Sequence, residues 1–370
     1  MNRSAWPAKL YHRVCLLALF FVAAAASFNG AYAKWHFREA GVAGAMAPAS
    51  FDAMLNGTAA RPYVYRQLLP AVARWIDGRI PAQWVDRMFT AQGGGPTFLS
   101  HMIDSPMAQD RAWFVRYWIV YLLAFLFAWL AVCALYELGK AAGFTPAASA
   151  LAAVAFILLM PYFCTVGGYF YDYPELAFMA LAAWMALKCR WGWMVPLAAL
   201  AACNKESFLL FVPTLYPLLR LRASRLSALL GSATIGAACA AAYAALSWKF
   251  HGNPGGSVEN HALDQVHYLL DLFIDSMKEK TYGLPMVQPL NLIFIALLIW
   301  TAVRGWRSLP RAFQRHAQIA AAINVPLFLL LCAPGEWRDL SLLYVALFLL
   351  MVANVEKWMG AVMPGGKTAP

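Results

Sequence analysis

Residues 113–138 read WFVRYWIVYLLAFLFAWLAVCALYEL, and this stretch decides the class of fold. Between Arg116 and Glu137 it holds 20 consecutive residues without an Asp, Glu, Lys or Arg. A helix needs about 20 mainly apolar residues to cross the hydrocarbon core of a bilayer. The stretch therefore predicts a membrane-spanning helix.

The composition of the whole chain agrees with this. Of the 370 residues, 62% are hydrophobic and only 13% are charged, which is too little polar surface to cover a water-soluble globule of this size. The formal net charge is +11, but the basic residues lie in short clusters between apolar runs, which argues against nucleic-acid binding. The seven cysteines show no C-x-x-C spacing, so we expect neither a zinc site nor a disulfide framework.

Further apolar segments extend the prediction to the rest of the chain. The candidate spans are 14–33, 113–138, 146–166, 175–188, 226–247, 286–303, 317–333 and 340–357. We therefore expect an all-α fold, a polytopic transmembrane helix bundle of about eight full spans that forms one transmembrane domain over residues 1–370. The first segment is also compatible with a cleaved signal peptide, because Ala31-Tyr32-Ala33 resembles a cleavage site.

The distribution of charge predicts the orientation of the bundle. With the N-terminus inside, 15 of the basic residues and two of the acidic residues fall on the inner side, and the outer side keeps a balance of −2. Short cytoplasmic loops collect Lys and Arg, so this split predicts that both termini are cytoplasmic.

Two long segments then lie outside, namely 34–112 and 248–285. At helical spacing, residues 61–76 (RPYVYRQLLPAVARWI) place five side chains on an apolar face: Val64, Leu68, Val72, Trp75 and Ile76. Arg66 falls on the polar face, and Pro70 would kink the helix. This pattern predicts an amphipathic helix that lies in the membrane interface or packs on its own loop.

Two short segments, 191–203 and 207–219, interrupt the series of full spans. Each has 13 residues, which gives about 20 Å of helix, less than the hydrocarbon core of about 30 Å. We expect a hairpin that turns inside the membrane, with Lys205 and Glu206 at its tip. Ionisable residues at such depth indicate a functional site, although an ion pair that only closes the turn is also compatible.

Asp172 and Glu175 stand three residues apart at the start of a predicted helix, so they share a face beside Tyr171. They suit a catalytic or metal-binding role, and the ring of Tyr171 suits stacking on a sugar. Carboxylates in the first turn of a helix are also ordinary caps, and aromatic residues are typical of the membrane interface.

The last outer turn carries Glu336 and Arg338. Arg338 offers a planar fork for phosphate, and Glu336 could orient it, although Glu336 also suits a helix start. Asp52, in the first outer segment, faces the same side as these residues. Together, the outer charged residues predict one outward-opening cleft.

The helix pattern and four short phrases resemble the GT-C class of membrane glycosyltransferases, in particular its bacterial members. The phrases are RPYVYRQLLP (61–70), YDYPE (171–175), NKES (204–207) and GEWRDL (335–340). The resemblance implies transfer of a sugar from a polyprenyl-phosphate donor to an acceptor. It places this reaction on the periplasmic face of the bacterial inner membrane, among membrane lipids.

The resemblance also implies roles for single residues. Asp52 or Glu39 would be the general base, while Lys205, Arg338 and Arg66 would meet the donor phosphate. The first outer segment lacks the D-x-D or E-D pair of this class, which leaves the base and any divalent cation open.

Two other classes of function compete with this one. A transporter or lipid-linked glycan translocator, without covalent chemistry, would show charges along a path through the membrane and paired halves of similar hydropathy. A noncatalytic scaffold would disperse its outer carboxylates. The sequence shows no convincing inverted repeat, and it assigns no oligomeric state.

Overall fold

The computed structural model describes residues 5–40, 47–90, 97–256, 260–270, 280–285 and 290–362. It is an all-α structure with 15 α-helices in these ranges. They are α1 (Ala5–Trp35), α2 (Phe51–Asn56), α3 (Leu68–Asp77), α4 (Ala82–Phe89), α5 (Phe98–His101), α6 (Phe114–Ala141), α7 (Pro146–Phe163), α8 (Asp172–Leu187), α9 (Trp191–Asn204), α10 (Ser207–Leu219), α11 (Arg225–Lys249), α12 (Ala262–Leu270), α13 (Leu290–Trp306), α14 (Arg311–Leu331) and α15 (Tyr344–Val362).

Short elements connect these helices. They are the 3-10 helices η1 (His36–Arg38), η2 (Ala47–Ala49), η3 (Tyr63–Tyr65) and η4 (Trp337–Leu343), and the antiparallel strands β1 (Lys280–Thr281) and β2 (Leu284–Pro285). Tyr282 and Gly283 join the two strands with positive φ angles, which suits a two-residue hairpin turn. This small hairpin lies beside α1, because Thr281 accepts a hydrogen bond from Lys34.

Five helical segments are long and apolar enough to cross a membrane: Leu10–Arg38, Phe114–Ala141, Pro146–Phe163, Arg225–Lys249 and Trp337–Ala361. The chain is thus a helical, multi-pass membrane protein. The expected spans 175–188, 286–303 and 317–333 correspond to α8, α13 and α14, which do not belong to this group. The helices α8 and α13 have only 16 and 17 residues, and α14 begins with charged residues. Residues 286–289 lie outside the described part of the chain.

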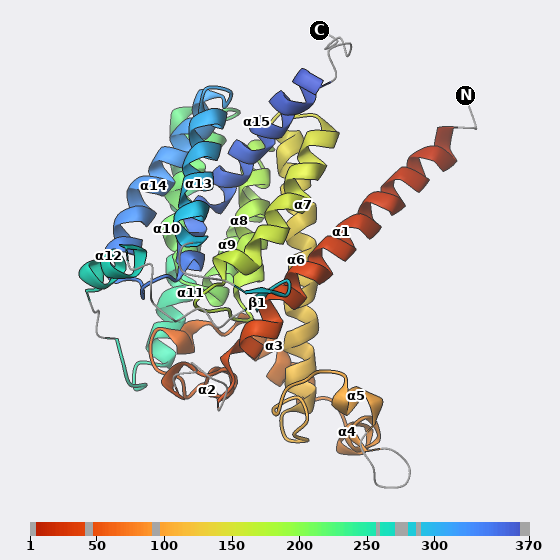
Figure 1. Cartoon of the computed structure of the whole chain (residues 1–370). Helices are drawn as coiled ribbons and strands as arrows, with labels where there is room; N and C mark the ends of the chain where they lie inside the picture. The colour runs from red at the N-terminus through yellow and green to blue at the C-terminus, as the bar shows by residue number, and fades with distance from the viewer. Residues whose placement is uncertain are drawn as a thin grey trace.

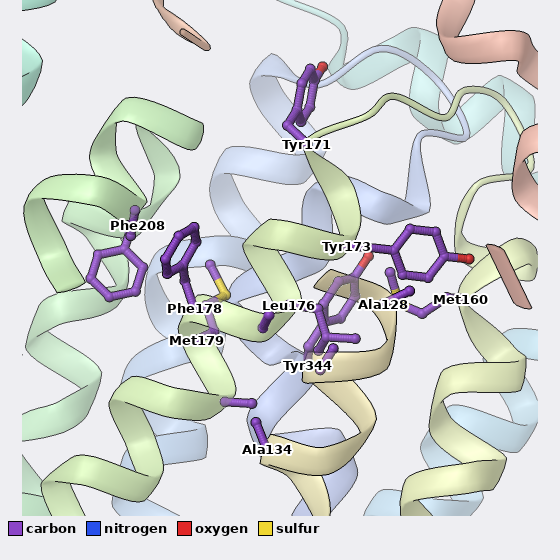
Figure 2. Close-up of a cluster of buried hydrophobic side chains, with 14 of the residues drawn as sticks. Ala128, Ala134, Met160, Tyr171, Tyr173, Leu176, Phe178, Met179, Phe208 and Tyr344 are labelled. Carbon is purple, nitrogen blue, oxygen red and sulfur yellow. The ribbon is translucent and has the colours of Figure 1, made fainter. Parts of the chain in front are cut away.

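The central helix of the bundle is α8. Of its 16 residues, 13 are buried, and it packs against α6, α9 and α10. A helix that is apolar on all sides belongs in the interior, so the local sequence agrees with this position. Figure 2 shows Phe178 of α8 beside Phe208 of α10, with Tyr171 directly before the start of α8.

The other long helices pack against one another in pairs. The pairs in close contact include α1 with α7, α9 with α11, α10 with α14, and α13 with α15. Both chain ends lie at the same end of the bundle, and α6 runs past α7 and α8 toward α4 and α5 at the other end (Figure 1). The end of the bundle away from the termini therefore carries the folded connecting segments.

The first connecting segment differs from the expected amphipathic helix over residues 61–76. A 3-10 turn occupies Tyr63–Tyr65, and α3 begins only at Leu68, with Pro70 in its first turn. A proline is tolerated in a first turn because its missing N–H would have no partner there, so it does not kink the helix. Arg66, which was predicted to lie on the polar face, is buried instead, whereas Trp75 of the predicted apolar face is 60% exposed, as a side chain that meets the membrane interface would be.

The predicted hairpin agrees with the structure to within one residue. α9 ends at Asn204 and α10 begins at Ser207, so Lys205 and Glu206 form the turn. Neither α9 nor α10 reaches 20 residues. The turn comes at the level where α8 begins, because Asn204 donates to the carbonyl of Tyr171 at 3.0 Å.

Candidate functional site

Charged side chains from five segments meet where α8 begins, at the end of the bundle away from the chain termini (Figure 1). They come from η1, the segment after η3, the start of α8, the α9–α10 turn and the start of η4. We call this set the charge cluster. Its members are Arg38, Arg66, Asp172, Glu175, Lys205, Glu206, Glu336, Arg338 and Asp339.

Arg338 occupies the middle of the charge cluster and is only 3% exposed. Its guanidinium lies 3.3 Å from Asp172 and 3.0 Å from Glu336. Asp172, the first residue of α8, also accepts the backbone N–H of Tyr169, in the segment before that helix, at 2.8 Å. Arg38 approaches the other oxygen of Glu336 at 3.7 Å. The predicted pair of Glu336 and Arg338 therefore exists, and it is joined to α8.

Lys205 forms the second centre of the charge cluster. Its ammonium lies 2.9 Å from Glu175 and 3.1 Å from Asp339. Glu175 accepts two further hydrogen bonds, from Ser207 at 2.5 Å and Ser341 at 2.6 Å. Lys205 thus pairs with α8 and η4, and not with its neighbour Glu206 as the closed-turn interpretation of the hairpin required.

Arg66 forms the third centre, around the ring of Tyr171. Its guanidinium lies 4.3 Å from the centroid of that ring, donates to the Tyr171 hydroxyl, and pairs with Glu206 at 3.1 Å. Tyr169 and Tyr171 stack with their centroids 4.9 Å apart, and Arg338 lies 4.7 Å from the centroid of Tyr169. Burial raises the pKa of Tyr169 to about 12 and that of Tyr171 still further, so both phenols are neutral.

The charges of the cluster nearly balance, with four cations against five carboxylates. Every cation is paired in the described structure. Six polar atoms at this site nevertheless lack a hydrogen-bond partner within the described ranges: Arg38 Nε, Arg66 Nε, Arg338 Nε, Tyr169 Oη, Asn204 Oδ1 and Glu206 Oε2. Because an unpartnered buried polar atom is costly, these atoms mark where the arrangement accepts a further polar group.

Two of the predicted catalytic residues lie outside the charge cluster. Glu39 is fully buried and accepts hydrogen bonds from Ser105, Met107 and Tyr117, the first at 2.8 and 2.9 Å. It ties the first connecting segment to α6. Asp52, in α2, is half-buried, and within the described ranges it accepts one hydrogen bond, from the backbone N–H of Ala40 at 3.2 Å.

The pocket that the structure describes beside the charge cluster is small compared with the expected outward-opening cleft. This pocket, lined in part by Trp35, Tyr169 and Asp172, has a volume of about 10 Å³. Such a volume is about that needed for one water molecule. Nor do the described residues include a group of three or more His, Cys, Asp or Glu side chains placed to hold a metal ion.

The sequence interpretation omitted several members of this site. Asp339 also belongs to the site, because it lies 3.1 Å from Lys205 and 4.0 Å from Arg338. Arg38 was not predicted as a site residue, and Tyr169 is one of the aromatic residues beside Asp172 and Glu175 in the sequence. The position of Asp339 beside Arg338 in the phrase GEWRDL is the sequence feature that could have identified it. Arg38 has no such local feature, because its partner Glu336 is almost 300 residues away.

Comparisons with protein-family models, with curated proteins and with solved structures found no match. The likeness to the GT-C class therefore depends on the sequence phrases and on the helix pattern.

Proposed function

We propose that this chain is a GT-C-like membrane glycosyltransferase, which transfers a sugar from a polyprenyl-phosphate donor to an acceptor. In this proposal the bacterial inner membrane holds about eight full spans and the α9–α10 hairpin, with both termini cytoplasmic. The charge cluster then lies toward the periplasmic side. The short connecting helices α2 to α5 lie at the outer interface.

The observation that carries this proposal is the convergence of Arg66, Lys205 and Arg338 at the start of α8. All three cations surround one ring, that of Tyr171, at 4.3 to 5.9 Å from its centroid. A sugar phosphate departs with negative charge on its phosphate, and preorganised cations stabilise that charge in the transition state. A lipid-linked donor also accounts for a site built between membrane helices.

In the state without donor, the carboxylates of the charge cluster bind the cations. They then occupy the positions that the phosphate oxygens of the donor would take. Glu206 and Asp339 are its most accessible carboxylates, with side chains 29% and 20% exposed. Donor binding then exchanges these two carboxylates for phosphate oxygens on Arg66 and Lys205. This exchange also provides the space that the pocket of about 10 Å³ lacks.

Asp52 is the best candidate for the general base that deprotonates the acceptor hydroxyl. Its neighbour Phe51 packs on Phe170 with centroids 5.3 Å apart, which brings α2 beside the segment that carries Tyr171. The carboxyl of Asp52 is half-buried, whereas those of Glu39, Asp172 and Glu175 are buried and already occupied by donors. A base must reach its substrate, so accessibility favours Asp52.

The test uses the full-length protein in proteoliposomes with a panel of polyprenyl-phosphate sugars, and it measures release of polyprenyl phosphate. We expect Asp52→Asn to reduce turnover by about 10²–10⁴-fold, because it removes the base without changing the size of the side chain. Glu206→Gln should tighten donor binding, since it removes the carboxylate that competes for Arg66. Asp86→Asn is the matched control, because Asp86 is an exposed carboxylate of the same connecting segment.

Two results would contradict the proposal. One is an equal loss of turnover in Asp52→Asn and Asp86→Asn, which would remove Asp52 from the mechanism. The other is movement of the lipid-linked sugar across the bilayer without any covalent product. That outcome would identify a translocator in place of a transferase.

A further inference from the structure

A second polar site lies at the opposite end of the bundle, the end that carries both chain termini (Figure 1). It is a pocket of about 710 Å³ between the end of α10, the start of α11 and the first turns of α14. Small-molecule sites commonly have volumes of about 300–1,000 Å³. This pocket is far larger than the one beside the charge cluster, and it shares no residue with it.

Four arginines line this pocket: Arg220, Arg225, Arg311 and Arg315. Arg220 donates to the carbonyl of Ala223 at 2.5 Å. Within the described part of the chain, no hydrogen bond or ion pair engages the other three guanidiniums, and no carboxylate lines the pocket. The pocket therefore concentrates positive charge without compensation.

The backbone adds to this positive charge. Arg225 is the first residue of α11 and Arg311 is the first residue of α14, so two helix N-termini border the pocket. The N-terminus of a helix carries partial positive charge and favours anions. Arg311 and Arg315 also stand four residues apart on one face of α14, a spacing at which like charges repel each other. An anion between them would relieve that repulsion.

We propose that this pocket binds a phosphate group, and that its natural source is the headgroup of an anionic phospholipid. Guanidinium groups match phosphate oxygens in pairs, and basic pockets between the ends of membrane helices suit acidic headgroups. The lining also includes apolar side chains, among them Ile319 and Leu221, the latter 52% exposed. A lipid can place its acyl chains along such a surface, which a free phosphate ion cannot use.

Arginines near the cytoplasmic ends of helices also arise from membrane topology alone. Arg222 and Arg307 provide the comparison, because they are exposed at the same end of the bundle and do not line the pocket. If membrane topology were the only reason for these arginines, those that line the pocket and those outside it would contribute equally to lipid binding. If the pocket is a binding site, only its own arginines would matter.

The experiment is native mass spectrometry of the full-length protein in detergent, titrated with phosphatidylglycerol or with phosphatidylcholine of the same acyl chains. We expect phosphatidylglycerol to remain bound preferentially, and Arg311→Gln/Arg315→Gln to weaken it by roughly tenfold or more. Arg222→Gln/Arg307→Gln removes the same charge and should leave binding unchanged. Gln318→Glu, which adds a carboxylate to the lining and keeps every arginine, should also weaken binding.

A second measurement distinguishes the two sources of phosphate. Inorganic phosphate is added to lipid-free protein at constant ionic strength, and the thermal midpoint is recorded for the wild type and both double variants. A rise that requires Arg311 and Arg315, without preferential lipid retention, would assign the pocket to a soluble phosphate. Equal lipid binding by both double variants, or no binding of either anion, would overturn the proposal.

Discussion

At the scale of single residues, the protein keeps several ionised side chains away from water. Lys205, Glu175 and Arg338 are 5%, 3% and 3% exposed, and each is held by opposite charges or hydroxyl donors. Breaking a buried pair costs more than the pair contributes, because one charge is left without compensation. The charge cluster is therefore sensitive to the loss of any single member.

This sensitivity gives a prediction for Lys205→Met. The substitution leaves Glu175 and Asp339 without their shared cation, so we expect a loss of about 3–5 kcal/mol in the free energy of unfolding. Adding Glu175→Gln should recover part of that loss. The thermal midpoint in detergent, followed by tryptophan fluorescence, measures both effects.

Lys140→Met is the matched control. Lys140 pairs with Glu137 at 2.7 Å, but the two side chains are 33% and 48% exposed. An exposed pair contributes at most about 1 kcal/mol. Equal losses of unfolding free energy in Lys140→Met and Lys205→Met would mean that burial does not raise the cost of breaking an ion pair in the charge cluster.

At the scale of elements, small residues decide how closely neighbouring helices approach. A Cβ atom on Gly305 of α13 would lie 2.8 Å from the backbone oxygen of Leu350 in α15. Asn354 of α15 reinforces the same crossing, because it donates to the carbonyl of Thr301 at 2.9 Å. The contact between α13 and α15 therefore requires a glycine at position 305.

We accordingly predict that Gly305→Ala destabilises the protein by about 1–3 kcal/mol, because the two backbones must move apart. Gly360→Ala provides the opposite case within α15. Within the described part of the chain its Cβ would meet no atom within 4 Å, so we expect the better helix propensity of alanine to add up to about 1 kcal/mol. Thermal midpoints of the two variants should therefore shift in opposite directions, and a shift in the same direction would refute this account of the crossing.

At the scale of the whole molecule, the outer surface of the bundle is apolar. Val22 of α1, Leu226 of α11 and Val303 of α13 are each more than 60% exposed, together with many other large hydrophobic side chains. A water-soluble protein rarely exposes apolar surface on this scale. The fold therefore needs lipid around it, which agrees with its membrane-spanning helices.

Reporter fusions test the proposed orientation in this lipid. After residue 222, between α10 and α11, a fluorescent protein that folds only in the cytoplasm should fluoresce. After residue 252, beyond α11, alkaline phosphatase should be active because that enzyme requires the periplasm. The reverse pattern would invert the whole bundle and place the charge cluster on the cytoplasmic side.

The amino-acid sequence by itself determined the class of the protein and the limits of its hairpin. Hydropathy is a sum over neighbouring residues, so runs such as 113–138 identify membrane helices without any knowledge of the fold. The turn at Lys205 and Glu206 was predictable for the same local reason. The number of full spans was less predictable, because α8 and α13 are short helices whose burial depends on their neighbours.

Only the tertiary structure decided which charges meet. Lys205 and Asp339 are 134 residues apart, and Arg338 and Asp172 are 166 residues apart, so no local pattern relates them. The helical periodicity of residues 61–76 placed Arg66 in solvent, whereas packing against Tyr171 buries it. Glu39 and Asp52 looked alike in sequence, and only their hydrogen-bond donors separate a structural carboxylate from an accessible one. Ion pairing depends on distances across the fold, which the packing of the helices sets.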